Sequence, residues 1–97
     1  MMRFEMGYNI IYDASSLLKK DLQYLHQHPK DAHRIKTTLE IFATNPLGFF
    51  GDIKKLSPKE DNISRIRVGN YRIVFSLDFG NQMILVHRIG QRKDVYK

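Results

Sequence analysis

The chain lacks cysteine, and it lacks any apolar run that approaches the ~20 residues needed to cross a bilayer. The first absence excludes disulfides and thiolate chemistry, which fits a reducing compartment. The second absence excludes a membrane-spanning helix, and the N-terminal residues carry no long apolar segment of the signal-peptide kind. We therefore expect a cytoplasmic protein without a membrane partner.

Several constellations that carry chemistry are also missing. No cysteine or carboxylate cluster joins the histidines, which stand in three separate contexts, so the sequence predicts no metal site. No glycine-rich stretch has the spacing of a phosphate loop, no serine lies in a nucleophile elbow, and no paired carboxylates suit glycosidase catalysis. We expect an activity that needs neither a metal nor a cofactor. The histidines are His26, His28, His33 and His87.

Positive charge is in excess. The 97 residues include 16 Lys and Arg against 10 Asp and Glu, which gives a net charge of +6. Such a balance favours a polyanionic partner, which can be nucleic acid, an anionic surface or an acidic protein. The length predicts a single domain over residues 1–97, with a real but small core.

The first half of the chain predicts one strand followed by a helical hairpin. Residues 8–12 form a short β-type run. Leucines at spacings of four and three then predict an amphipathic helix that ends before Pro29, with N-cap candidates at 13–16. A second apolar stripe predicts a helix that begins around residues 29–31, and Asn-Pro at 45–46 ends it.

The second half predicts a loop over residues 47–52, a short strand over 53–56 and then longer antiparallel strands. A Gly-Asn turn at 69–70 and a turn at 79–82 separate them. The last strand is apolar on both faces, as expected of an inner strand. Helices and strands that occupy separate stretches of the chain indicate an α+β fold with an N-terminal strand, an antiparallel helical hairpin and a three- to four-stranded antiparallel sheet.

Three arginines stand on the two strands that flank the Gly-Asn turn. Arg65 and Arg67 are two residues apart and share one face of their strand, whereas the residues after each point to the other face and can be buried. A hairpin would bring Arg72 close to both. Three guanidinium groups repel one another unless an anion lies between them, and arginine is well suited to phosphate. The identity of that anion is the functional question, and a basic, solvated sheet face is the ordinary alternative.

An RNA substrate would need little further chemistry. The 2′-hydroxyl attacks its own phosphodiester once a base removes its proton, cations stabilise the doubly charged phosphorane, and an acid protonates the leaving 5′-oxygen. No metal is required for this reaction.

Two stretches carry a resemblance to a known family. Residues 65–75 read Arg-Ile-Arg-Val-Gly-Asn-Tyr-Arg-Ile-Val-Phe, and residues 90–96 read Gly-Gln-Arg-Lys-Asp-Val-Tyr, with an apolar strand between them. Together with the helical hairpin and the Lys-Lys-Leu segment at 54–56, this pattern resembles the RelE branch of the RelE/ParE toxin superfamily. The resemblance implies a RelE-like, microbial-RNase-like fold and a toxin of a type II toxin–antitoxin system. It further implies a ribosome-dependent endoribonuclease that cleaves mRNA in the A site.

The resemblance also implies partners and residue roles. The partners are a cognate RelB-like antitoxin, the ribosome with its mRNA, and operator DNA only through the antitoxin complex. Arg65 and Arg67 match the basic residues that hold the mRNA and among which the proton acceptor is sought. Arg72 matches a phosphate-binding arginine, Arg92 one that stabilises the transition state or assists the leaving group, and Tyr96 a tyrosine that contacts the cleaved nucleotide. Contacts with the RNA are expected from Lys54, Lys55 and Lys93.

Two departures leave the general base open. Gln91 stands where many relatives have a histidine, and arginines replace the lysines that some relatives use before the turn. Arginine stays protonated near pH 7 and is a poor base. Tyr96 can transfer a proton only if its pKa is lowered, and His87 only if it faces the site; its alternation with apolar residues favours a partly buried structural histidine. The alternatives are a ParE-like inhibitor of DNA gyrase and a degenerate relative that binds only antitoxin or RNA.

Overall fold

One five-stranded sheet forms the centre of the structure, a computed structural model that describes residues 7–56 and 63–91. The strand order is β1-β5-β4-β3-β2, in which β2 to β5 are antiparallel neighbours and β1 runs parallel to β5. The sequence prediction of an α+β fold is therefore confirmed, with the N-terminal strand added to the antiparallel sheet. The strands are β1 Asn9–Tyr12, β2 Asp52–Lys55, β3 Ile63–Val68, β4 Tyr71–Asp78 and β5 Met83–Gly90.

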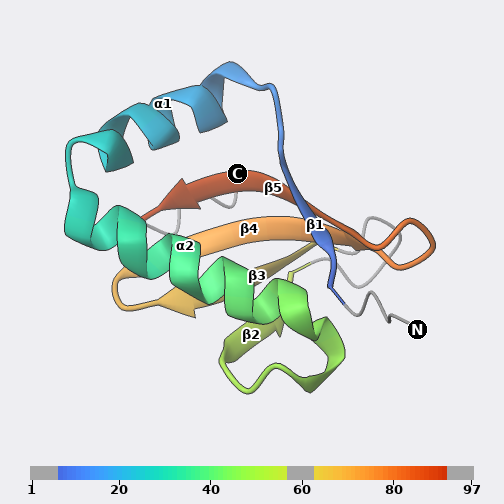
Figure 1. Cartoon of the computed structure of the whole chain (residues 1–97). Helices are drawn as coiled ribbons and strands as arrows, with labels where there is room; N and C mark the ends of the chain where they lie inside the picture. Colours follow the sequence, from blue (N-terminus) through green and yellow to red (C-terminus); the bar gives the residue numbers. More distant parts are fainter. Residues whose placement is uncertain (1–6, 57–62, 92–97) are drawn as a thin grey trace, which may run out of the picture.

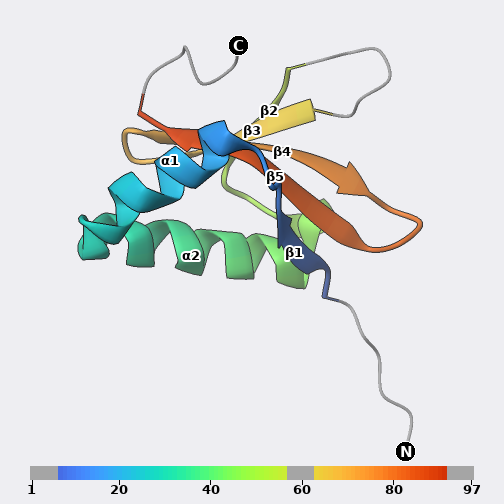
Figure 2. The ribbon, with the colours of Figure 1, turned by 90° about the horizontal axis from the view of Figure 1, so that it is seen from above.

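Two helices form the predicted hairpin, α1 Ser16–His26 and α2 Pro29–Thr44. Ser15 caps α1, because its Oγ accepts a hydrogen bond from the backbone N–H of Leu18 at 3.1 Å. Pro29 opens α2, where a missing N–H is no loss. The helix α2 lies along one face of the sheet, and α1 lies beside the end of β5 (Figures 1 and 2). The expected loop after α2 begins with a short 3₁₀ helix, Pro46–Gly48.

The core lies between the helices and one face of the sheet. Ile66 and Val68 are buried there, whereas Arg67 between them is exposed, as their alternation predicts. Two aromatic rings from distant parts of the chain meet in this layer, because the Phe42 and Phe75 centroids lie 5.0 Å apart. The largest fully buried side chains are Phe42, Phe75, Leu18, Leu39, Ile66, Ile73, Ile84 and Val86.

Beyond the end of β1, a carboxylate side chain accepts a hydrogen bond from the exposed edge of β5. The last residue of β1 pairs with Val86, so the outer edge of β5 beyond that point has no strand beside it among the described residues. Asp21 of α1 takes this place and accepts hydrogen bonds from the Ile89 N–H at 3.0 Å and from Arg88 Nε at 2.7 Å. The carboxylate thus pairs an edge N–H and fixes α1 to the sheet.

The turn between β3 and β4 uses the conformational freedom of glycine. Gly69 has a φ of +60°, as expected for the first central residue of a type II′ hairpin turn. This geometry explains why glycine precedes asparagine here. A Cβ at position 69 would lie 2.9 Å from Nη2 of Arg34, so α2 places a further guanidinium against this turn. Arg34 was not among the residues predicted for the site, because it lies on α2, far from the turn in the sequence.

Tyr71 links this turn to α2 and gives a prediction about alkaline stability. Its buried hydroxyl donates a hydrogen bond to Asp31 Oδ2 at 2.8 Å, and burial together with this bond raises the pKa of Tyr71. A tyrosine pKa that is higher in the folded state stabilises the fold below the unfolded value near 10 and loses that contribution as the pH rises further. We expect Tyr71→Phe to lower the free energy of unfolding by about 1–3 kcal/mol at pH 7.

The same variant should also lose less stability than the wild type between pH 9 and 11, as measured by urea unfolding. Tyr8→Phe is the matched control, because it removes a hydroxyl from a half-buried ring without a described hydrogen bond. An unchanged alkaline profile in Tyr71→Phe would contradict the role given to the bond with Asp31.

Candidate functional site

A row of directly opposed residues crosses four strands next to the β3–β4 turn. Asp52 of β2 lies opposite Arg67 of β3. Arg67 lies opposite Arg72 of β4, and Arg72 lies opposite Gly90 of β5. Opposed residues share a face, and this face is turned away from the core that Ile66 helps to form. Within the described residues no helix covers it, so we call it the open face (Figure 2).

A second row lies two residues further along the strands on the same face. Lys54 is opposite Arg65, and Arg65 is opposite Val74. The predicted proximity of Arg65, Arg67 and Arg72 is therefore confirmed, and Lys54 lies beside them. The roles of these residues in binding and catalysis stay a prediction. Lys55 is opposite Ser64 and points to the other side of the sheet.

An anion does lie between two of the arginines, and it belongs to the chain itself. Nη1 of Arg65 lies 2.9 Å from Oδ1 of Asp52, and Nη1 of Arg67 lies 3.7 Å from Oδ2. The hydrogen bond from Arg65 holds the pKa of the Asp52 carboxyl below its usual range, and the positive charges of Arg65 and Arg67 add to this effect. The sequence predicts a loop at Asp52, whereas this residue is the first of β2. Its place opposite Arg67 depends on strand pairing and is seen only in the structure.

Arg72 is held at the other end of the row. Its Nη1 donates a hydrogen bond to the backbone carbonyl of Gln91 at 2.8 Å, and the opposed residue Gly90 has no side chain to compete for the space. Arg72 is half-buried, so its head is ordered at the surface without being part of the core. The remaining sequence-predicted residues lie outside the described residues: Arg92, Lys93 and Tyr96.

His87 also lies on the open face, but at a distance from the arginines. Its Nε2 shares a hydrogen bond with Ser76 Oγ, and its Nδ1 lies 3.7 Å from Asp13 Oδ2. Ser76 is four positions from Arg72 on β4, which corresponds to about 13 Å along a strand, and two positions from Val74, the residue opposite Arg65. These contacts agree with the expected structural role of His87. Among residues 7–56 and 63–91, no group of His, Cys, Asp or Glu could hold a metal ion.

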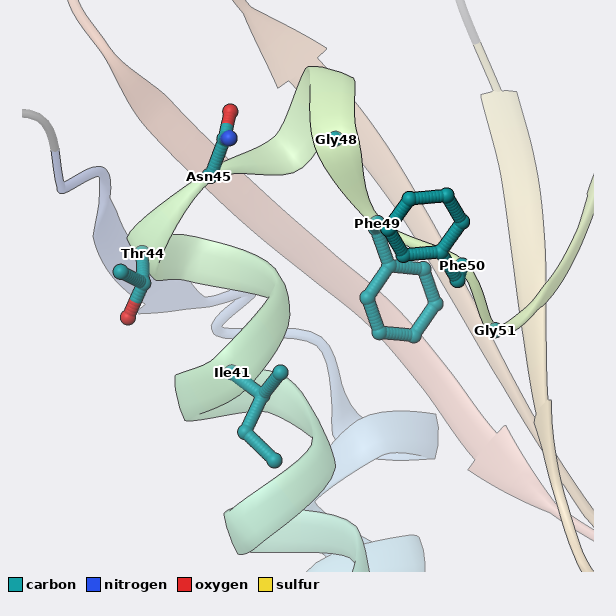
Figure 3. Close-up of a pocket in the computed structure, with 7 residues that line it drawn as sticks. All are labelled: Ile41, Thr44, Asn45, Gly48, Phe49, Phe50 and Gly51. Carbon is teal, nitrogen blue, oxygen red and sulfur yellow. The ribbon is translucent and has the colours of Figure 1, made fainter.

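An apolar hollow of about 490 Å³ lies elsewhere, between the end of α2 and the loop before β2 (Figure 3). Ile41 on the helix and Phe50 on the loop line it and are strongly exposed, whereas Phe49 packs against Phe42 with centroids 5.1 Å apart. The lining contains no titratable side chain, so acid–base chemistry is not expected there. The charged residues of the open face remain the candidate site.

Comparison with known proteins identifies the class of protein to which the chain belongs. The family model for the ParE toxin of type II toxin–antitoxin systems (parDE) matches residues 12–96. The chain is 30% identical over 79 residues to the protein named "Putative toxin RelE1" of Methanocaldococcus jannaschii, which covers 80% of this chain and 84% of that protein. The chain thus has the fold and sequence of a toxin from a toxin–antitoxin system. It belongs to the RelE/ParE superfamily.

Solved structures agree on the fold. The archaeal RelE–RelB complex from Pyrococcus horikoshii matches with a TM-score of 0.70 at 22% identity, over 91% of this chain and 98% of that chain. The Escherichia coli DinJ–YafQ toxin–antitoxin complex matches with a TM-score of 0.71 at 16% identity, over 94% and 99%. The expected RelE-like fold is confirmed. In the described part of the chain, no helix has the length and apolar character that a membrane crossing needs.

Proposed function

We propose that this toxin is a metal-independent endoribonuclease that cleaves mRNA in the ribosomal A site. The observation that carries the proposal is that Arg67 and Arg72 lie directly opposite each other on the open face. Arg65 lies two residues along β3 on the same face. Guanidinium groups so arranged suit the oxygens of a phosphodiester and the extra charge of a phosphorane. The resemblance of residues 65–75 and 90–96 to RelE points to the same substrate.

In this reaction the chain supplies electrostatic stabilisation first. Arg67 and Arg72 bind the scissile phosphate, and Arg65 adds charge at its edge. Arg92 and Tyr96 are proposed to act on the leaving oxygen and the adjacent base, and Lys54 and Lys93 to contact the RNA backbone. Lys55 is proposed to contact RNA as well, but from the other side of the edge strand β2. Interactions that strengthen as the phosphorane gains its second negative charge accelerate the reaction, whereas those equal in ground and transition states do not.

The proposed partners follow from the same assignment. A RelB-like antitoxin would neutralise the toxin in the cytoplasm, and operator DNA would be bound only by the complex of the two. The ribosome would present the mRNA codon. The net charge of +6 suits the polyanionic ribosome and its mRNA, and the M. jannaschii relative carries the name "Putative toxin RelE1".

A second candidate is inhibition of DNA gyrase, because the matching family model carries the ParE name. Controlled expression in a bacterium distinguishes the two, when incorporation of labelled methionine and labelled thymidine is followed in parallel. We expect protein synthesis to stop first, within the first minutes, with DNA synthesis declining later. An earlier stop in DNA synthesis would favour gyrase, and no effect on either would favour a catalytically degenerate toxin.

A further inference from the structure

The proposed cleavage needs a group that accepts the proton of the 2′-hydroxyl, and the arginines cannot be that group. Arginine and lysine stay protonated at neutral pH, which removes Lys54, Arg65, Arg67 and Arg72 as proton acceptors in their stable forms. The His87 ring is engaged by Ser76 and Asp13 and lies along the sheet away from the Arg67–Arg72 pair. Asp52 is the carboxylate that the described residues place among these arginines.

We propose that Asp52 is the general base of this toxin and takes the proton from the attacking 2′-hydroxyl. The inference rests on the proposed function above, since it concerns the same reaction at the same site. It assigns a catalytic role to a residue that the resemblance to RelE did not single out.

The geometry leaves one carboxylate oxygen for the substrate. Oδ1 of Asp52 accepts a hydrogen bond from Arg65, which fixes the orientation of the carboxyl group. Oδ2 lies 3.7 Å from Arg67, beyond hydrogen-bond distance, and within the described residues it accepts no hydrogen bond. The Asp52 side chain is 53% exposed on the open face, so an RNA hydroxyl can reach it.

The spacing of the row also fits a ribonucleotide. Asp52 stands one strand from Arg67 and two strands from Arg72, or about 5 and 10 Å at the backbone. A phosphate held between Arg67 and Arg72 therefore lies one strand away from the carboxylate. The attacking 2′-oxygen approaches its phosphorus to about 3–3.5 Å, so it lies within reach of Asp52 Oδ2.

The surrounding charges affect this role in two ways. The hydrogen bond from Arg65 and the charges of Arg65 and Arg67 lower the pKa of Asp52, so the carboxylate is ionised at neutral pH, although the same effect makes it a weaker base. When Asp52 takes the proton it becomes neutral, and the arginines lose their internal anion as the phosphorane gains charge. The positive charge of the site thus shifts from the base to the transition state, where it stabilises the reaction.

The 2′-hydroxyl proton moves to Oδ2 of Asp52, the bond between the 2′-oxygen and phosphorus forms, and the bond between phosphorus and the 5′-oxygen breaks. The 5′-oxygen takes a proton from water, and the protonated Asp52 returns its proton to solvent. The products are a 2′,3′-cyclic phosphate and a 5′-hydroxyl end.

The alternative role for Asp52 predicts the opposite result. A carboxylate that only occupies the arginines would compete with the phosphate, and its removal would speed cleavage by about three- to tenfold through weaker repulsion. A general base contributes about 10²–10⁴-fold to the rate, so its removal slows cleavage by that factor. The two roles are therefore separated by the sign of one rate change.

The test is single-turnover cleavage on ribosomes programmed with a defined A-site codon, with full-length wild type, Asp52→Asn and Asp78→Asn. Asp52→Asn keeps an oxygen that can accept from Arg65 and should lower the cleavage rate by about 10²–10⁴-fold. Asp78→Asn removes an acid six positions from Arg72 on β4 and should leave the rate within about twofold, as expected of a surface change outside the site. Binding to the same ribosomes with a 2′-deoxy codon should be unchanged or tighter in Asp52→Asn.

The cleavage rates and the binding measurements together decide whether Asp52 is the general base. Wild-type cleavage with an equal or faster rate in Asp52→Asn overturns the role as base, and so does a loss that is explained by weaker binding of the 2′-deoxy complex. Partial rescue of Asp52→Ala by sodium formate, but not by sodium chloride at equal ionic strength, supports it. A wild-type chain that cuts no message contradicts the proposed function itself, and the inference falls with it.

Discussion

Replacing Arg72 with alanine is expected to lower mRNA cleavage by about 10²–10³-fold, because one preorganised donor to the transition-state phosphate is lost. The Arg72 head lies at the surface of the open face and donates to the Gln91 carbonyl, and the side chain is not part of the core. The melting temperature should therefore change little, as is usual for substitutions outside the core. Growth arrest on expression should disappear with the cleavage activity.

Two variants sharpen this experiment. Arg72→Lys keeps the charge but loses the planar pair of donors, so it should recover only part of the activity. Lys20→Ala removes one positive charge from an exposed position on α1, and it should remain toxic. Full toxicity of Arg72→Ala would count heavily against the assignment of the open face as the site of cleavage.

The largest effect on stability is expected from Phe42→Ala, at about 3–5 kcal/mol. Phe42 is fully buried, and its ring contacts both Phe75 of β4 and Phe49 of the loop before β2. Its removal leaves a cavity between the helix layer and the sheet. Since small domains have about 5–15 kcal/mol in total, the variant should lose a large part of its stability.

Ile41→Ala is the matched control, because the neighbouring side chain is 60% exposed. It should change the free energy of unfolding by no more than about 0.5–1 kcal/mol in a urea titration. If Phe42→Ala were as stable as Ile41→Ala, the position given to the core between α2 and the sheet would be wrong.

Much of this fold could be predicted from local patterns. The leucine spacing and Pro29 located the helical hairpin, and the alternation around Ile66 separated the buried face of β3 from the arginine face. The Gly69-Asn70 turn was predicted as well, and its order is explained by the positive φ of Gly69. These features depend on residues that are close in sequence, where periodicity and turn chemistry carry most of the information.

Features that depend on distant residues could not be predicted. The sequence indicated an N-terminal strand, but its parallel pairing with β5 and the pairing of Asp21 with the Ile89 N–H are tertiary. Asp52 was predicted to be the last residue of the loop over 47–52, whereas strand pairing with Arg67 decides its position. The predicted strand began one residue later, at 53, so the sequence did not show that Asp52 is paired with Arg67 on the arginine face.

The central claim is that the chain cuts mRNA on the ribosome, and mapping of mRNA 5′ ends by primer extension in a cell-free translation reaction tests it most directly. The purified chain should produce new 5′ ends within the codons that ribosomes occupy, and the same message without ribosomes should stay intact. Arg72→Ala should produce none of these ends. Intact message together with undisturbed translation would contradict the account, and inhibition of DNA supercoiling by gyrase would then be the function to measure.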